Sequence, residues 1–331
     1  MKLNTIKQFG QGVKYPIMMG ALIALGAHLA ASSAPSDATY KGSKICMMCH
    51  RTMDISKTIV ASYVQTAHYS ALQPATNANA IVADFSSAPF TKDKVAYVLG
   101  VGHRQQAYLD ANFQLLPAEW SVATKSWVKV EPVDAKAQCI RCHTTGFDAT
   151  NDTWVEMGVG CEMCHGPGST HLAKMVSAPD AQKLEIAKQT ILMPKDLPPQ
   201  RLDMICGQCH SVGKDKDGHP FPASFRPGDD LNAVFTLAQV TGPGRNQQYN
   251  DYIQSKHYAA GITCITCHDP HGNTDQPDQL RQPVNQLCLT CHKSQITDPA
   301  AHIQQHKGAA DAKCSDCHMP QGRHLFTKPA P

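Results

Sequence analysis

Residues 158–171, GVGCEMCHGPGSTH, place two cysteines, a histidine and a second histidine within one short glycine-rich stretch. Cys161 and Cys164 are separated by two residues, and His165 follows directly. In this C-x-x-C-H pattern the two thiols can form thioether bonds to the vinyl groups of a porphyrin, while the adjacent imidazole reaches the iron. The stretch therefore predicts a c-type haem. His171, which follows a short Gly/Pro turn, can reach the far face of a neighbouring haem.

The same pattern occurs seven times and uses all 14 cysteines of the chain. The cysteines are Cys46 and Cys49, Cys139 and Cys142, Cys161 and Cys164, Cys206 and Cys209, Cys264 and Cys267, Cys288 and Cys291, and Cys314 and Cys317. The histidines that follow them are His50, His143, His165, His210, His268, His292 and His318. A zinc ribbon does not need a histidine after each cysteine pair, and a redox dithiol is not repeated seven times. The sequence thus predicts seven covalently bound haem c groups, each with one of these histidines on its iron.

The other histidines can supply the second axial ligand, which decides whether a haem transfers electrons or binds a small molecule. Of the 17 histidines, seven belong to the motifs and His28 lies near the N-terminus, so nine remain for seven irons. We expect the second ligands to be His68, His171, His257, His271, His324, one of His302 and His306, and His103. His219 is a further candidate. For each of them the alternative is a structural or surface histidine.

The composition is that of a globular protein, with 42% hydrophobic and 17% charged residues among 331. The net charge of +3 and the absence of a basic run argue against a nucleic acid partner. Two propionates on each haem would make the loaded protein acidic. Redox partners with basic patches are therefore expected.

The first 31 residues are typical of an export signal, because Lys2, Lys7 and Lys14 precede the apolar stretch YPIMMGALIALGAHLAAS. Cleavage is expected between Ala30 and Ala34, and an uncleaved anchor is the alternative. Export predicts a periplasmic or extracellular protein. In that oxidising compartment the cysteines could have formed a disulfide scaffold, but their spacing favours haem.

Two haem-binding regions are expected after this signal, residues 32–198 with motifs one to three and residues 199–331 with motifs four to seven. An insertion, residues 51–138, separates the first two motifs. Within it, residues 113–130 predict a β-hairpin with a polar turn. Residues 177–190 predict a short helix capped by Ser177. The motifs themselves are expected to open short helices, giving a mostly α, loop-rich multihaem cytochrome c fold with stacked haem pairs.

Several stretches resemble a known superfamily: GCEMCHGPGSTH, CIRCHTTGF, YVLGVGHRQQAYL, CITCHDPHG and CSDCHMP. They are similar to the multihaem cytochromes c that include tetrahaem electron-transfer cytochromes, pentahaem nitrite reductase and hydroxylamine oxidoreductase. The resemblance implies stacked, bis-histidine haems of low potential, with His171 and His271 as distal ligands. Two features depart from the enzymes. Every motif here ends in histidine, whereas the nitrite reductases carry lysine at the catalytic haem, and no tyrosine is clearly placed to cross-link a porphyrin.

The leading hypothesis is an electron-transfer protein whose haems connect a donor to an acceptor, both redox proteins, one of them membrane-associated. A homo-oligomer or a filament is compatible with the sequence. The alternative is a reductase or oxidase of a small nitrogen or sulfur oxyanion at one five-coordinate haem. In that case His103 or His219 would face the substrate, with Arg104 or Arg226 as its anion-binding group. Haem storage is a third hypothesis, which close packing of the irons disfavours.

Overall fold

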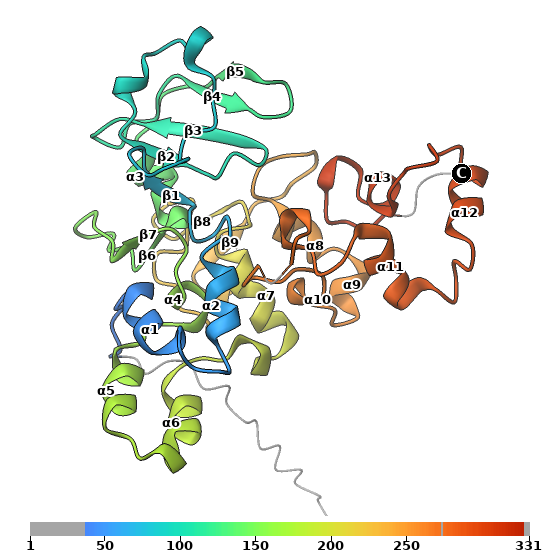
Figure 1. Ribbon diagram of the computed structural model, residues 1–331. Helices are drawn as coiled ribbons and strands as arrows, with labels where there is room; N and C mark the ends of the chain where they lie inside the picture. Colours follow the sequence, from blue (N-terminus) through green and yellow to red (C-terminus); the bar gives the residue numbers. More distant parts are fainter. Residues whose placement is uncertain (1–36, 273, 328–331) are drawn as a thin grey trace, which may run out of the picture. The chain divides into compact units, whose positions relative to one another are not determined.

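The computed structural model describes residues 37–272 and 274–327 (Figure 1). The expected export signal, residues 1–31, lies outside the described residues. Short helices joined by turns make up most of the regular structure, as the sequence predicts. The predicted boundary between residues 198 and 199 stays a proposal.

The helices in chain order are α1 (Ser43–His50), α2 (Lys57–Tyr63), α3 (Ala135–Gln138), α4 (Glu162–His165), α5 (Ser169–Ser177), α6 (Lys183–Thr190), α7 (Pro199–Gly207), α8 (Gln248–Tyr252), α9 (Lys256–Ala259), α10 (Cys264–Cys267), α11 (Val284–His292), α12 (Pro299–Gln305) and α13 (Cys314–His318). Motifs five and seven begin helices α10 and α13, as expected. Motifs one and six instead end helices α1 and α11. The second motif adopts a 3₁₀ turn, Ile140–His143.

The insertion forms a five-stranded antiparallel sheet in which each strand pairs with the next in the chain (Figure 1). Its strands are β1 (Leu72–Pro74), β2 (Tyr97–Leu99), β3 (Gln105–Leu109), β4 (Ala118–Ser121) and β5 (Ser126–Lys129). Two small two-stranded sheets are formed by β6 (Thr144–Thr145) with β7 (Glu156–Met157), and by β8 (Gly213–Asp215) with β9 (Phe235–Leu237).

The predicted hairpin is confirmed as β4 and β5, which pair with Trp120 opposite Trp127. It begins at Ala118 rather than at residue 113, because Phe113 has a positive φ of 62° and takes part in a turn. The hairpin is also the edge of the larger sheet, since β3 pairs with β4. The prediction missed strands β1 to β3 because each is short and their polar connections hide the alternation.

The two faces of the sheet have different neighbours, because successive side chains of a strand point to opposite sides. Val98 and Tyr108 lie opposite each other and pack in an aromatic cluster with Trp120. On the other face, Leu72, Leu99 and Leu109 pack against Ile140, which is fully buried inside the second motif. The sheet thus supports the backbone of one haem motif.

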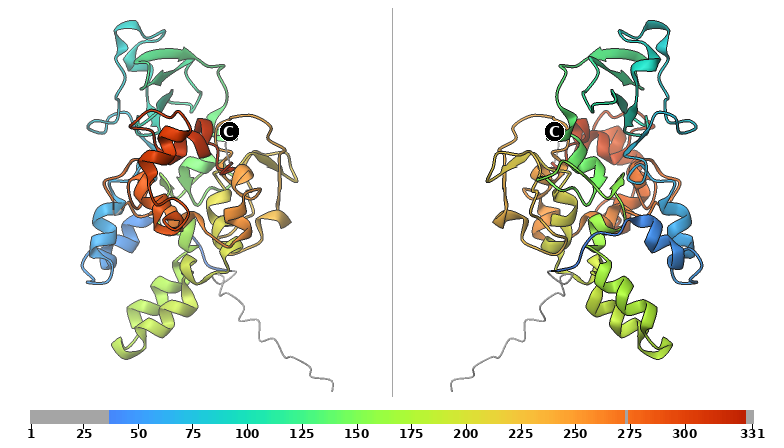
Figure 2. Two further views of the ribbon diagram at one scale, coloured as in Figure 1. Left: turned by 90° about the vertical axis from the view of Figure 1, so that its right-hand side faces the viewer. Right: turned by 90° about the vertical axis from the view of Figure 1, so that its left-hand side faces the viewer.

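Helices α5 and α6 lie side by side, as both views of Figure 2 show. The predicted helix is present as α6, but Ser177 does not cap it. Ser177 is the last residue of α5, and its hydroxyl donates to the carbonyls of Ala173 and Lys174 within that helix. A serine that donates to its own helix is not available to cap the next one.

Candidate functional site

Six histidines of the motifs each face one histidine from outside the motifs. Four pairs have nearly parallel rings and are called the parallel pairs. They are His50 with His171 (ring centres 6.3 Å apart, planes at 21°), His165 with His271 (6.1 Å, 19°), His268 with His324 (6.3 Å, 26°) and His318 with His302 (6.4 Å, 12°). Two pairs, called the perpendicular pairs, are His210 with His68 (6.1 Å, 77°) and His292 with His257 (5.9 Å, 88°).

These separations fit a metal ion between the two rings. A bond from a metal to an imidazole nitrogen is about 2 Å long, and the nitrogen lies about 1 Å from the ring centre, so two axial imidazoles have centres about 6 Å apart. Direct ring stacking would bring the centres closer, as for Tyr97 and Phe113 at 4.3 Å. The arrangement is therefore the one that a haem iron with two axial histidines requires.

Hydrogen bonds at the Nδ1 atoms leave the opposite ring nitrogen, Nε2, available for iron. Nδ1 of His165 lies 2.8 Å from the carbonyl oxygen of Leu192, and Nδ1 of His268 lies 2.8 Å from that of Asp278. A ring that donates from Nδ1 to a carbonyl is held in the tautomer that coordinates through Nε2. The same kind of bond links His143 to Ala71, at 2.9 Å, and His318 to Thr327, at 3.0 Å.

His143, in the second motif, differs from the other six. Its ring is held by the Ala71 carbonyl like that of a ligand. Within residues 37–272 and 274–327, however, no other imidazole lies at the separation seen in the six pairs. The second motif is thus the one whose histidine lacks an imidazole opposite it in the described part of the chain.

Three expected or candidate ligands lie outside the six pairs. His103 is exposed in the loop between β2 and β3. His306 follows α12, with its ring 4.8 Å from that of His302, which in turn faces His318. His219 lies 3.0 Å from a carboxylate oxygen of Asp215.

The two arginines expected near a substrate have protein partners. Arg104 forms an exposed ion pair with Asp278 at 2.7 Å. Arg226 donates to the backbone carbonyl of Ala38 at 3.0 Å. Arg226 also lines a small cavity that is described below.

The seven motifs are numbered 1 to 7 in chain order, from the one ending at His50 to the one ending at His318. Contacts between their thiols show which motifs are neighbours. A hydrogen bond between Cys46 and Cys161 raises the pKa of the former and lowers that of the latter to about 7. A hydrogen bond to Cys206 raises the pKa of Cys264. Motif 1 thus adjoins motif 3, and motif 4 adjoins motif 5.

Two more thiol contacts extend this order. A hydrogen bond to Cys142 raises the pKa of Cys209, and burial together with the neighbouring Cys314 raises the pKa of Cys288 to about 11. Motif 2 therefore adjoins motif 4, and motif 6 adjoins motif 7. The weaker influence of Cys206 on Cys164, and of Cys291 on Cys267, links motif 3 to 4 and motif 5 to 6. The motifs form the series 1, 3, 4, 5, 6, 7, with motif 2 beside motif 4.

Two buried carboxylates join the motifs to distant parts of the chain, and neither was predicted as a functional residue from the sequence. Glu162 of motif 3 is 1% exposed and accepts hydrogen bonds from the backbone of Lys41, Gly42 and Gly168. Asp203 accepts from the backbone of Cys264 at 2.8 Å. Their partners lie far away in the chain. The one local signal is an acidic residue inside or beside a motif.

Comparisons with known proteins match two parts of the chain to families of c-type cytochromes. The family of the doubled CXXCH motif matches residues 256–297, and the family of cytochrome c554 and c-prime matches residues 105–166. Curated relatives include the cytochrome c nitrite reductase subunit NrfA of Nitratidesulfovibrio vulgaris (25% identical, 42% of this chain and 33% of the relative). They also include the dissimilatory sulfite reductase MccA of Wolinella succinogenes (26%, 55% and 27%) and the multiheme cytochrome MtrA of Shewanella baltica (26%, 41% and 42%). The matches thus span less than half of each of these relatives.

Two solved structures share the fold. The outer cell wall cytochrome OcwA has a TM-score of 0.66 at 20% identity, covering 87% of this chain and 79% of that one. The undecaheme cytochrome from the S-layer of Carboxydothermus ferrireducens has a TM-score of 0.53 at 19% identity, covering 88% and 52%. Residues 37–272 and 274–327 therefore share the fold of these two cytochromes, one of which is an undecaheme protein.

Proposed function

Because this chain is a multihaem c-type cytochrome, we propose that it transfers electrons between redox partners along seven covalently bound haems. The six imidazole pairs carry this proposal, because two axial histidines leave an iron without a position for substrate and suit it to electron transfer. When bound, the haems supply the electron chemistry. The protein sets their spacing, ligation and surroundings.

The order of the motifs supports a route for the electrons. Because cysteines of neighbouring motifs lie close together, the vinyl edges of successive haems would also lie close together, and electrons would pass through haems 1, 3, 4, 5, 6 and 7, with haem 2 joined to haem 4. We propose stacked haem pairs along this series. Donor and acceptor would meet its two ends, near Cys49 of motif 1 and Cys317 of motif 7, both of which are exposed.

An exported location is part of the proposal. The similar structures come from an outer cell wall and an S-layer. None of the helices in the described residues is both long and apolar enough to cross a membrane. We propose a periplasmic or extracellular protein that starts with an export signal in residues 1–31 and meets a membrane-associated donor or acceptor.

Haem content and redox titration test this function. Mass spectrometry of the exported protein should give seven haems, and a spectroelectrochemical titration should show low potentials for the bis-histidine haems. The reduced protein should transfer the electrons of all its haems to an added acceptor, and not those of one haem alone. A protein with zinc, disulfides or free thiols in place of haem would contradict the proposal.

A second function is favoured by His143. An iron held by this histidine alone would keep one open position, where a small nitrogen or sulfur oxyanion could be reduced by electrons from haem 4. The test is turnover of nitrite and of sulfite with a reduced viologen dye. Turnover that is lost when cyanide occupies one haem per chain would support the reductase. No turnover of either anion would leave electron transfer as the function.

A further inference from the structure

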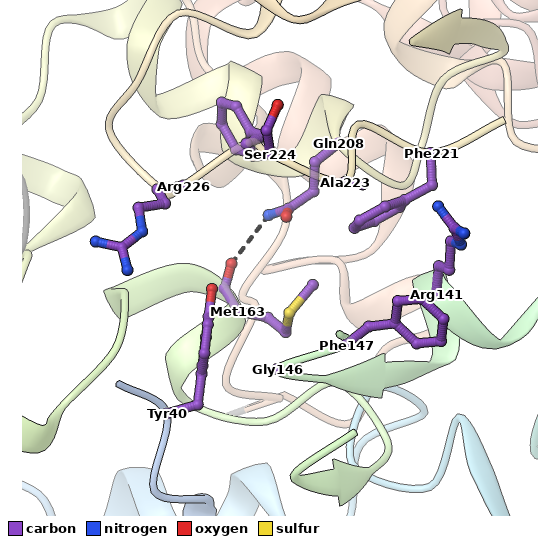
Figure 3. A pocket seen from close by; sticks show the side chains of 11 residues that line it. Tyr40, Arg141, Gly146, Phe147, Met163, Gln208, Phe221, Ala223, Ser224 and Arg226 are labelled. Atoms are coloured by element: carbon purple, nitrogen blue, oxygen red, sulfur yellow. Dashed lines mark hydrogen bonds between the residues drawn. The ribbon is translucent and has the colours of Figure 1, made fainter. Parts of the chain in front are cut away.

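A small cavity of about 180 Å³ lies where motifs 2, 3 and 4 meet, and it is lined by one residue from each (Figure 3). The three residues are Arg141, Met163 and Gln208, and each directly precedes the second cysteine of its motif. The side-chain amide of Gln208 donates to the backbone carbonyl of Met163 at 2.9 Å, which joins motif 4 to motif 3. Three haem motifs thus contribute to the wall of the cavity, together with residues from outside the motifs.

These three side chains point away from the haems of their own motifs. In an α-helical turn, positions i, i+3 and i+4 share one face, and in these motifs they are the two cysteines and the histidine that would bind the haem. In the 3₁₀ turn of motif 2, positions i and i+3, the two cysteines, share one face. The residue at i+2 lies on the opposite face. The cavity therefore lies behind three haem motifs, and none of the described histidines is among the residues that line it.

Arg141 is the unusual member of this cavity. Its side chain is buried, with 5% of the residue exposed, and its Nε and Nη1 atoms have no hydrogen-bond partner among the described residues. The guanidinium lies over the ring of Phe147, 4.8 Å from its centre. Within residues 37–272 and 274–327, Arg141 forms no salt bridge to a carboxylate. A buried charge without a counterion is strongly destabilising, so a missing anionic partner is indicated.

The rest of the cavity suits an anion. Figure 3 shows Arg141 and Phe147 on one side of the cavity and Arg226 on the other. Tyr40 also lines it. Burial raises the pKa of this tyrosine, and the positive charge of Arg226 partly opposes that rise. Two arginines and a tyrosyl hydroxyl thus surround a space that Phe147 and Phe221 keep apolar at one side.

We propose that this cavity binds a carboxylate or small oxyanion through the guanidinium of Arg141. The planar N–H edge of arginine matches the two oxygens of such a group, and this pairing offsets the cost of the buried charge. Two sources can supply the group. One is a free anion such as acetate or sulfate. The other is a haem propionate from a more distant haem, since propionates leave the porphyrin at the edge opposite the thioether bonds and so point away from motifs 2, 3 and 4.

A free anion at this position would act on the potentials of nearby haems. Negative charge stabilises the oxidised iron, so the anion binds the oxidised protein more tightly, and by reciprocity it lowers the midpoint potential. A tenfold difference in affinity between the two redox states corresponds to about 59 mV for one electron. Electron transfer along the haems does not require this site, so the site can be absent while the proposed function holds.

The experiment is a redox titration of the haem-loaded protein at constant ionic strength, with and without sulfate or acetate. These anions are poor ligands for haem iron, so an effect at His143 is avoided. The variants are Arg141→Gln, Arg141→Lys and the control Arg104→Gln, which changes an exposed arginine outside the cavity. Haem content and spin state of each variant show whether it has folded, and Arg141→Lys retains the charge if Arg141→Gln does not fold.

If the cavity binds a free anion, the midpoint potential of at least one haem should fall as sulfate or acetate is added, in the wild type and in Arg104→Gln. The fall should level off when the site is full. The shift should be lost in Arg141→Gln and weakened in Arg141→Lys, which keeps the charge without the planar pair of donors. If a haem propionate occupies the cavity, sulfate and acetate should leave the midpoint potentials unchanged. The propionate bending band in resonance Raman spectra should then change in both Arg141 variants and not in Arg104→Gln. If neither the titration nor the Raman band responds to Arg141, the proposal is overturned.

Discussion

Replacement of His302 should convert one haem from low spin to high spin, whereas replacement of His306 should not. Both residues belong to the stretch AHIQQH at the end of α12, one helical turn apart. The ring of His302 has its centre 6.4 Å from that of His318, with the planes at 12°. The ring of His306 instead lies beside that of His302, at 4.8 Å. His302 is therefore the one placed to share an iron with His318.

The expected size of the effect follows from the number of pairs. Six motif histidines have an imidazole partner and His143 has none in the described residues, so one haem in seven should be high spin in the wild type. His302→Ala should raise this to two in seven. His306→Ala should leave it at one in seven. The double variant should have the same high-spin fraction as His302→Ala. That result would show that His306 does not bind the iron when His302 is absent.

Spin quantitation by electron paramagnetic resonance, referred to the haem content by mass spectrometry, measures these fractions. The samples should be monomeric by size-exclusion chromatography, so that no second chain supplies a ligand. An increase in high-spin haem in His306→Ala but not in His302→Ala would refute the pairing. A wild-type monomer without any high-spin haem would refute the assignment of His143 as the unpaired ligand.

Four further predictions follow from the geometry of the motifs. Glu162→Ala removes the acceptor for three backbone N–H groups, of which those of Gly42 and Gly168 are buried, and should lower the free energy of unfolding by about 3 kcal/mol. The measurement is chemical denaturation of the loaded protein, and a loss below about 1 kcal/mol would contradict this. Gly158→Ala places a Cβ atom 2.2 Å from the carbonyl oxygen of Tyr69, at a φ of 85°. It should lower the free energy of unfolding more than Gly218→Ala, whose φ of 84° is similar but whose surroundings are open. Equal losses of unfolding free energy would show that the clash is relieved. Cyanide should bind tightly to one haem per chain, that of His143, and the optical titration should end at one equivalent rather than at several. Finally, low-spin haems should show two classes of paramagnetic resonance signal in the ratio four to two, because the parallel and perpendicular pairs give the iron different symmetry; a single class would contradict the ring angles.

Motif 2, which contains the unpaired His143, lies beside motif 4 and outside the series of the other motifs. The sheet of the insertion packs through Leu72 and Leu109 against Ile140 of this motif, and the Ala71 carbonyl, next to β1, holds the His143 ring. The insertion thus packs against the segment that would hold haem 2. In the proposed series the other haems would be connected without haem 2, so a reductase site on this branch would leave electron transfer along the main series intact.

The sequence alone predicts the covalent haem sites, because the chemistry is local. Two thiols and an imidazole within five residues of one turn reach a single porphyrin whatever the rest of the chain does. The hairpin β4–β5 and helix α6 are predictable for the same reason. Strands β1 to β3 are not, because each is only three to five residues long and is stabilised by pairing with the next strand.

Only the tertiary structure decides which imidazoles face each other. His68 comes from a turn after α2 but lies opposite His210, and His171 on α5 lies opposite His50 on α1. No local pattern distinguishes His302 in α12 from His306 directly after it, and the position of His318 in α13 selects the first. The same holds for the missing partner of His143 and for the unpaired guanidinium of Arg141. Contacts between segments distant in the chain depend on the packing of the whole fold, whereas thioether attachment depends on neighbours in the sequence.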